Sequence, residues 1–295
     1  MTTGGEAPGS GGGPTVLRML LGAHLRRLRE AQGVSREDAG WEIRASESKI
    51  SRMELGRVSF KERDVEDLLT LYGQVDTDER ERLLALARQA NTPGWWHRYG
   101  DVLPNWFQSY LGLEAAASLI RTYEVQFVPG LLQTADYARS VVLLGHGRAK
   151  AEEIDRRVDL RMRRQKILDR PDPVQLWAVI DEAVLRRPVG SRATMRGQIQ
   201  ALIDATQRQS VHLQVLPFQV GGHSAAGGAF SILRFPEPEL PDVVYLEHLT
   251  NAIYLDKEDD VDQYLHVMET ICVRGAAPDR TVELLSRILK ESGDA

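Results

Sequence analysis

The sequence GVSREDAGWEIRASESKISRMELGR, at residues 33–57, contains two short amphipathic segments joined by a turn at Arg44 and Ala45. Gly40 supplies the small residue that is needed where one helix crosses the next, and the turn follows about five residues later. The apolar residues spaced to pack inward are Ala39, Ile43, Ala45, Ile50 and Met53. This arrangement predicts a helix-turn-helix, the motif whose second helix enters the major groove of DNA.

Helical patterns flank this motif on both sides. Leucines spaced three or four residues apart predict a helix over Val16–Gln32, and Gly33 is suited to end it. Two more helices are predicted over Lys61–Tyr72 and Asp76–Ala90, before the helix-breaking sequence NTPG at residues 91–94. We therefore expect a mainly α, five-helix DNA-binding domain over residues 16–92, preceded by a glycine-rich disordered tail over residues 1–15.

The charge distribution favours the same assignment. The chain of 295 residues has a net charge of −5, which alone argues against a nucleic-acid binder. However, residues 18–63 contain 11 basic and 7 acidic residues, whereas residues 64–92 contain 3 basic and 7 acidic residues. The basic excess therefore lies on the first four predicted helices, where contacts with DNA phosphates would be made.

Residues 93–295 change character and predict a second domain of the α+β class. Helices are expected from Asn105 to Tyr123, over Leu131–Leu144 and over Glu152–Leu168. After residue 173 the hydrophobic period shifts towards two, which is typical of strands. The expected strands are Gln175–Ile180, Val211–Leu216, Ala229–Phe235, Val243–His248 and Ala252–Leu255, with helices over Ser191–Gln207, Asp259–Arg274 and Asp279–Glu291.

Several other classes of protein are disfavoured. No window approaches about 20 uninterrupted apolar residues, so no membrane span is expected, and the N-terminus lacks the pattern of a secretory signal. Cys272 is the only cysteine, and its apolar neighbours favour a buried structural thiol over a reactive one. Neither an internal disulfide nor a cysteine metal cluster can form. We therefore expect a cytoplasmic protein without a cofactor or a metal ion.

The run S-x-S-x-I-S-R-x-E-x-G-R, from Ser46 to Arg57, closely resembles the Xre, or phage-repressor, family of helix-turn-helix regulators. This resemblance implies a lambda-repressor-like fold for the first domain. In that family an arginine of the first helix pairs with a glutamate late in the third, and Arg29 and Glu54 occupy these positions. Arg44 departs from the pattern, because the turn residue is usually glycine and a left-handed backbone costs another residue about 1 to 2 kcal/mol.

The motif also predicts which residues contact DNA. The outward-facing candidates on the second helix of the motif are Glu47, Ser48, Lys49 and Arg52, with Arg52 suited to a bidentate contact to guanine. Ser46 is expected to cap this helix and to offer its amide to a phosphate. Contacts to the DNA backbone are expected from Arg36, Arg57 and Lys61. The competing interpretation is a charged helix face that is only solvated.

Short sequences across the second domain resemble the C-terminal domain of actinobacterial Xre regulators of the WhiJ, or antitoxin-like, type. They are YLGLEAA (residues 110–116), YE (123–124), VPGLLQTADYAR (128–139), RMRRQ (161–165), DEAVLRR (181–187) and QVLP (214–217). The resemblance covers essentially the whole chain. It implies regulation of developmental or specialised-metabolism genes, often beside a gene for a small partner protein, and assigns the second domain no chemistry.

Several features of the second domain admit two interpretations. The aromatic segment 95–110 could line a ligand pocket or form core, and the glycine-rich segment 221–228 could cradle a phosphate or simply connect two strands. The charged helix over residues 152–170 is either solvated or a partner surface. Acidic residues and a histidine at strand ends suit acid–base chemistry or mere capping and ion pairing, and no catalytic motif accompanies them. They are Asp181, Glu182, Glu247 and His248.

We therefore predict a non-enzymatic, homodimeric transcriptional repressor that binds an inverted-repeat operator in double-stranded DNA. Dimerisation is expected because half-sites about 34 Å apart double the contacts of a single motif. The second domain would receive a signal from a small-molecule effector or a protein. The alternative is an antitoxin-like module that binds a small partner protein and autoregulates its operon, and a third hypothesis is an enzyme tethered to DNA.

Overall fold

The computed structural model of the chain describes residues 13–291. Its backbone contacts divide the chain into two compact units, with the boundary between Trp95 and Trp96. Each unit is described by itself. Of the tail expected over residues 1–15, residues 1–12 lie outside the described part of the chain. The first helix begins at Pro14, two residues earlier than expected. Proline favours this first helical position because its φ is already helical and its missing N–H would have no partner there.

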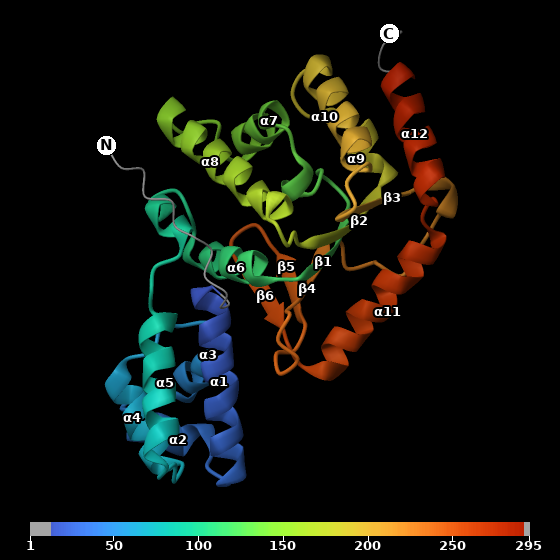
Figure 1. The fold of residues 1–295 in the computed structure, drawn as a ribbon. Coiled ribbons are helices and arrows are strands. Elements are labelled where there is room, and N and C mark those ends of the chain that lie inside the picture. The colour runs from blue at the N-terminus through green and yellow to red at the C-terminus, as the bar shows by residue number, and fades with distance from the viewer. Residues whose placement is uncertain (1–12, 292–295) are drawn as a thin grey trace. The chain divides into compact units, whose positions relative to one another are not determined.

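In its described part, residues 13–95, the N-terminal unit is helical (Figure 1). Its helices are α1 (Pro14–Ala31), α2 (Arg36–Glu42), α3 (Glu47–Glu54), α4 (Glu62–Leu71) and α5 (Thr77–Ala90). The five helices enclose one core, in which the apolar residues predicted to lock the motif are joined by side chains from α1, α4 and α5. The expected five-helix unit is therefore confirmed.

Serine hydroxyl caps explain where the two helices of the motif begin. Ser35 accepts a hydrogen bond from the amide of Asp38 at 3.0 Å, and Ser46 accepts one from the amide of Lys49 at 3.3 Å. Such caps satisfy amides that have no partner within the helix, and each contributes about 1 kcal/mol. Both helices of the motif therefore start at the residues that the sequence indicates.

Two glycines allow α1 and α3 to approach each other closely. A Cβ atom added at Gly22 would lie 2.4 Å from the carbonyl oxygen of Met53, and one added at Gly56 would lie 2.6 Å from the amide nitrogen of Met19. Gly40 has the same role between α2 and the turn, where an added Cβ would lie 2.8 Å from the oxygen of Ala45. The close packing of α3 against α1 and α2 therefore requires glycine at these positions, because a side chain there would collide with the neighbouring backbone.

The C-terminal unit is built on one six-stranded sheet with the order β3-β2-β1-β4-β5-β6. The strands are β1 (Leu119–Glu124), β2 (Gln175–Asp181), β3 (Val211–Leu216), β4 (Phe230–Arg234), β5 (Val243–Glu247) and β6 (Ala252–Leu255). β1, β2 and β3 are parallel to one another, whereas β4, β5 and β6 continue the sheet in antiparallel fashion. The predicted combination of an α domain and an α+β domain is confirmed.

Helices cover the sheet and extend beyond it (Figure 1). They are α6 (Asn105–Ala116), α7 (Ala135–His146), α8 (Ala151–Arg164), α9 (Glu182–Arg186), α10 (Arg192–Ala205), α11 (Glu258–Arg274) and α12 (Pro278–Glu291), with 3-10 turns at Trp95–Tyr99, Gly130–Leu132, Gln165–Asp169 and Phe218–Val220. α11 packs on the face of the sheet that carries Tyr123, Val179 and Ile232. α7 packs against α8, and α10 packs against α12.

One predicted helix was wrong over its last seven residues. The helix expected from Asn105 to Tyr123 ends at Ala116, and Leu119–Glu124 forms β1. The local pattern continues the helical period, but β1 pairs with β2 on one side and with β4 on the other. Partners more than fifty residues away therefore override local propensity, which is a weak prior for any short segment.

Two helix boundaries in the same unit also differ from expectation. The helix expected over Leu131–Leu144 is a 3-10 turn followed by α7, which starts after Thr134 accepts a hydrogen bond from the amide of Tyr137 at 3.3 Å. The helix expected over Glu152–Leu168 leaves the α form at Arg164 and continues as a 3-10 turn. Tight 3-10 turns of this kind are common at helix ends.

Candidate nucleic-acid interface

The outer face of α3 carries the predicted base-reading residues. Ile50 and Met53 point into the core, whereas Glu47, Ser48 and Arg52 are exposed. Ser48 and Arg52 are four residues apart and so lie on one face of the helix. Within the part of the chain that the structure describes, Arg52 makes no ion pair. Its five N–H donors are therefore available to a base edge.

Lys49 is held by the protein, in contrast to Arg52. Its Nζ lies 2.6 Å from Oδ2 of Asp64, a residue of α4 whose side chain is 3% exposed. The sequence predicted that Lys49 reaches bases or phosphates. In the structure Lys49 joins α3 to α4, so a contact between Lys49 and DNA stays a prediction in which the ammonium group would be shared with a buried carboxylate.

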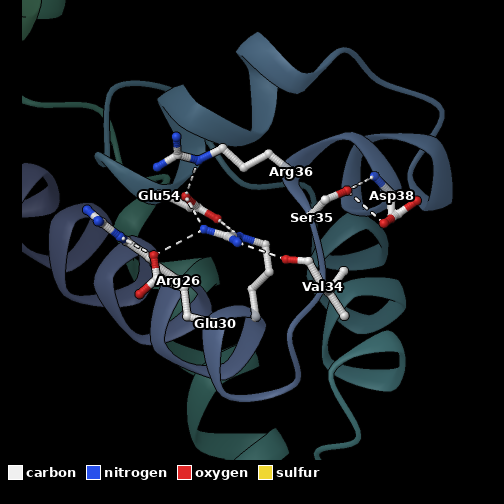
Figure 2. Close-up of polar contacts among 8 residues, drawn as sticks. Arg26, Glu30, Val34, Ser35, Arg36, Asp38 and Glu54 are labelled. Atoms are coloured by element: carbon white, nitrogen blue, oxygen red, sulfur yellow. Dashed lines mark hydrogen bonds and ion pairs between the residues drawn. The ribbon is translucent and has the colours of Figure 1, made fainter.

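A buried carboxylate between two arginines ties α3 to α1 and α2 (Figure 2). Arg29 donates from Nε to Oε1 of Glu54 at 2.5 Å, and the side chain of Glu54 is 2% exposed. Arg29 also donates to the carbonyl oxygen of Val34 at 2.9 Å. The hydrogen bond to Glu54 raises the pKa of Arg29. The two residues that the Xre pattern pairs therefore contact each other directly.

Arg36 is the third member of this cluster, which the sequence did not indicate. Its Nε donates to Oε2 of Glu54 at 2.9 Å, as Figure 2 shows. The expectation was a contact with the DNA backbone. The side chain of Arg36 remains 34% exposed, so the ion pair with Glu54 does not bury it completely. The position of Arg36 in the first turn of α2 gave no signal for the ion pair, because the partner lies eighteen residues further along the chain.

The remaining predicted contacts lie at the ends of helices. Ser46 is exposed at the N-cap of α3, where its hydroxyl group is used for capping. Arg57 is half-buried just beyond α3, and its amide donates to the carbonyl oxygen of Arg52 at 2.8 Å. Lys61 is exposed at the N-cap of α4 and makes no side-chain capping bond. Contacts of Ser46, Arg57 and Lys61 with DNA therefore stay predictions.

The turn between α2 and α3 has the left-handed backbone that the motif usually assigns to glycine. Arg44 has a φ of 53°, and among residues 13–291 it is the one non-glycine residue with a positive φ. Its side chain is exposed. The turn therefore retains the geometry of the motif at the strain cost expected for a residue with a Cβ atom.

The acidic residues at the strand ends of the C-terminal unit have structural partners. Asp181 caps α9 by accepting a hydrogen bond from the amide of Ala183 at 2.8 Å, and Glu182 pairs with Arg186 at 2.6 Å. Glu182 also accepts a hydrogen bond from the amide of Phe218 at 2.9 Å. This matches the interpretation of these residues as capping and ion-pairing groups.

Among residues 13–291, no cluster of three or more His, Cys, Asp or Glu side chains has the geometry to hold a metal ion. Cys272 is half-buried, and burial raises the pKa of its thiol to about 11, so it is not a reactive thiolate at neutral pH. Nor does any helix within the same residues have the length and apolar character to cross a membrane.

The aromatic segment 95–110 contributes to the core and also to a cavity. Tyr110 is buried, with its ring centroid 4.2 Å from that of Tyr245 and 5.5 Å from that of Phe107. Phe107 and Trp106 line a cavity of about 770 Å³ within the C-terminal unit. Within this segment Tyr110 is therefore core, whereas Trp106 and Phe107 line a cavity.

The glycine-rich segment 221–228 connects the 3-10 turn after β3 to β4. Gly221 and Gly228 have positive φ values of 66° and 92°. The segment precedes a strand, whereas phosphate-binding loops precede a helix whose N-terminus faces the anion. Its position therefore matches the interpretation as a connection between strands.

Comparison with known proteins identifies both units. Residues 20–83 match a family described as a helix-turn-helix domain. Residues 107–287, more than half of the chain, match a family described as a domain of unknown function, DUF5753. No curated protein and no solved structure matches the chain. The helix-turn-helix domain points to a DNA-binding, non-enzymatic regulator. The chain belongs to the DUF5753 family and carries an N-terminal helix-turn-helix domain.

Proposed function

We propose that the chain is a sequence-specific transcriptional repressor that acts in the cytoplasm as a homodimer and binds an inverted-repeat operator. The observation that carries this proposal is the exposed face of α3, on which Ser48 and Arg52 lie together while Ile50 and Met53 anchor the helix in the core. A single helix-turn-helix buries little DNA surface, and two copies on half-sites about 34 Å apart supply the contacts of a tight operator complex.

The residues around α3 support this geometry. Glu54 holds the C-terminal end of the helix through Arg29 and Arg36, and Asp64 holds Lys49 near its N-terminal end. A recognition helix must be positioned to within about 0.5 Å for its side chains to select a base. The resemblance to Xre regulators suggests developmental or specialised-metabolism genes as targets, with control through the C-terminal domain.

The proposal can be tested by selecting bound fragments of the source genome with the purified full-length protein and sequencing them. We expect enrichment of an inverted repeat by the wild-type protein. Arg82→Ala is a suitable control, because Arg82 lies on α5 with 77% of its side chain exposed. Failure of the wild-type protein to enrich any sequence would contradict the proposal and favour the antitoxin-like alternative, in which a small partner protein is the main ligand.

Arg52→Ala is expected to weaken binding to the selected operator by about 1 to 3 kcal/mol, because it removes a bidentate contact to a base. The preference at a single base pair of each half-site should relax at the same time. Titration of the operator and of its single-base variants measures both effects. An equal loss of affinity for random DNA would assign Arg52 to the phosphates instead.

Lys61→Ala is expected to weaken binding evenly across sequences and to reduce the slope of log K against log salt by about one unit. The substitution leaves the fold intact, because Lys61 is exposed and makes no side-chain capping bond. Lys166→Ala, at an exposed position in the C-terminal unit, is the matched control. A slope equal to that of the wild type would remove Lys61 from the phosphate contacts.

A further inference from the structure

A cavity of about 770 Å³ lies within the C-terminal unit, between the segment that leads into α6, helices α7 and α8, and the end of β5. Its volume falls within the range of about 300 to 1,000 Å³ that small-molecule sites occupy. Much of its wall is apolar, with aromatic rings from α6 and from the segment after β1 facing aliphatic side chains of α7 and α8. These residues are Trp106, Phe107, Phe127, Val142 and Leu160.

Three arginines of α8 also line this cavity, and two of them have carboxylate partners in the protein. Arg157 pairs with Glu153 at 2.8 Å. Arg164 binds both oxygens of Glu114, at 2.7 and 2.9 Å, and Glu114 is itself buried. The charges of these two guanidinium groups are therefore balanced by neighbouring side chains.

Arg161 is the exception. Its Nη1 donates to Oε1 of Gln133 at 2.8 Å, a neutral partner. In the part of the chain that the structure describes, Arg161 has no ion pair with a carboxylate. Burial, together with the charge of Arg164, lowers its pKa to about 10, so it remains charged at neutral pH. Arg161 is partly buried in the cavity wall, and a cation there without an ion-pair partner loses hydration that a bound anion would replace.

Glu247, Glu124 and Glu114 lie near enough to raise the pKa of Arg161, but none of them forms an ion pair with it in the part of the chain that the structure describes. Burial and the nearby charge of Glu247 raise the pKa of Glu124 to about 8, so Glu124 is largely neutral at pH 7. Glu247 accepts a hydrogen bond from the hydroxyl of Tyr245 at 2.9 Å and lies at the rim formed by the end of β5. The wall around Arg161 therefore combines N–H donors that no carboxylate binds with apolar surface, and the carboxylate of Glu247 lies at its rim.

We propose that this cavity binds a small organic anion, whose acidic group contacts Arg161 and whose apolar, ring-sized body packs against Trp106 and Phe107. The parallel N–H donors of an arginine guanidinium group are suited to the paired oxygens of a carboxylate, sulfonate or phosphate. In the regulator this molecule would be the effector, and that role rests on the function proposed above. The binding itself does not.

The test uses two fluorescent probes with the same hydrocarbon body and the full-length protein. 8-Anilino-1-naphthalenesulfonate carries an anionic group, and N-phenyl-1-naphthylamine lacks it. We expect saturable binding of both probes. Arg161→Gln should weaken binding of the sulfonate roughly tenfold or more, because it removes charge-assisted hydrogen bonds, and should change binding of the neutral probe by less than about twofold. Arg148→Gln, at an exposed arginine outside the cavity wall, should change neither.

A second variant tests the location of the site. Gly145 lines the cavity, and a Cβ atom added there meets open space, so Gly145→Trp adds a ring without a clash near the backbone. It should weaken the binding of both probes. The proposal is overturned if wild-type protein shows no saturable binding, or if Arg161→Gln affects both probes equally. Neither titration contains DNA, so this outcome is distinct from a failure to enrich an operator.

Discussion

Glu54→Ala is expected to lower the free energy of unfolding of the N-terminal unit by about 3 to 5 kcal/mol, because it leaves two guanidinium groups without the buried carboxylate that they share. Arg29 is itself buried, and its Nε donates to Glu54 at 2.5 Å, while Arg36 donates to the second oxygen at 2.9 Å. Hydrogen exchange of the amides of α3 measures the loss, since these amides exchange through unfolding of the unit.

Glu30→Ala provides the matched control for this substitution. Glu30 also contacts two arginines, Arg26 at 2.9 Å and Arg29 at 3.3 Å, but its side chain is 50% exposed. Exposed pairs of this kind contribute about 0 to 1 kcal/mol. If Glu54→Ala and Glu30→Ala changed the exchange of α3 equally, the buried cluster would not be what holds α3 in place.

Glu114→Ala is expected to destabilise the C-terminal unit by about 3 to 5 kcal/mol for the same physical reason. Arg164 would lose both hydrogen bonds of its buried pair, and it would remain close to the positive charge of the partly buried Arg161. The guanidinium carbon of Arg164 also lies 5.1 Å from the ring centroid of Phe107, a contact that would be lost if the side chain turned towards solvent. Urea unfolding followed by intrinsic fluorescence measures this effect.

Glu153→Ala removes the carboxylate of the neighbouring pair with Arg157 and should cost no more than about 1 kcal/mol, because Glu153 is 38% exposed. Combining Glu114→Ala with Arg164→Met should recover part of the stability, since no unpaired charge remains. An equal stability for Glu114→Ala and Glu153→Ala would contradict the importance of burial that both predictions share.

The helix-turn-helix was predictable because its signals are local. Ser35 and Ser46 cap the helices that they precede, and Gly40 stands within seven residues of the turn that it contacts. Capping and close packing over such short separations leave a direct pattern in the sequence. The later strands were predictable for a related reason. The spacing of apolar residues within each strand depends on which of its faces are buried, and this spacing can be seen in the sequence.

The features that the sequence did not indicate all depend on distant partners. The close approach of Gly22 to Met53 joins residues 31 positions apart, and the cluster of Arg36 with Glu54 and the pair of Lys49 with Asp64 likewise require the folded arrangement of the helices. The cavity wall also depends on distant partners, because the rings of α6 and the arginines of α8 come together only in the folded unit. A charged residue on an exposed helix face gives no sign of which carboxylate it will meet.

The central position of β1 also has a consequence for the order in which the chain folds during synthesis. Thr122 and Ser231, whose hydroxyl groups are 2.9 Å apart, are separated by 109 positions. β1 therefore cannot pair with β4 until most of the chain has left the ribosome. The helices α1 to α5 emerge from the ribosome well before that point. Domains generally fold as units from the N-terminus. A nascent or truncated chain that ends between residues 181 and 230 would carry a complete helix-turn-helix unit joined to a strand with one open edge, which is the kind of surface that pairs with other chains.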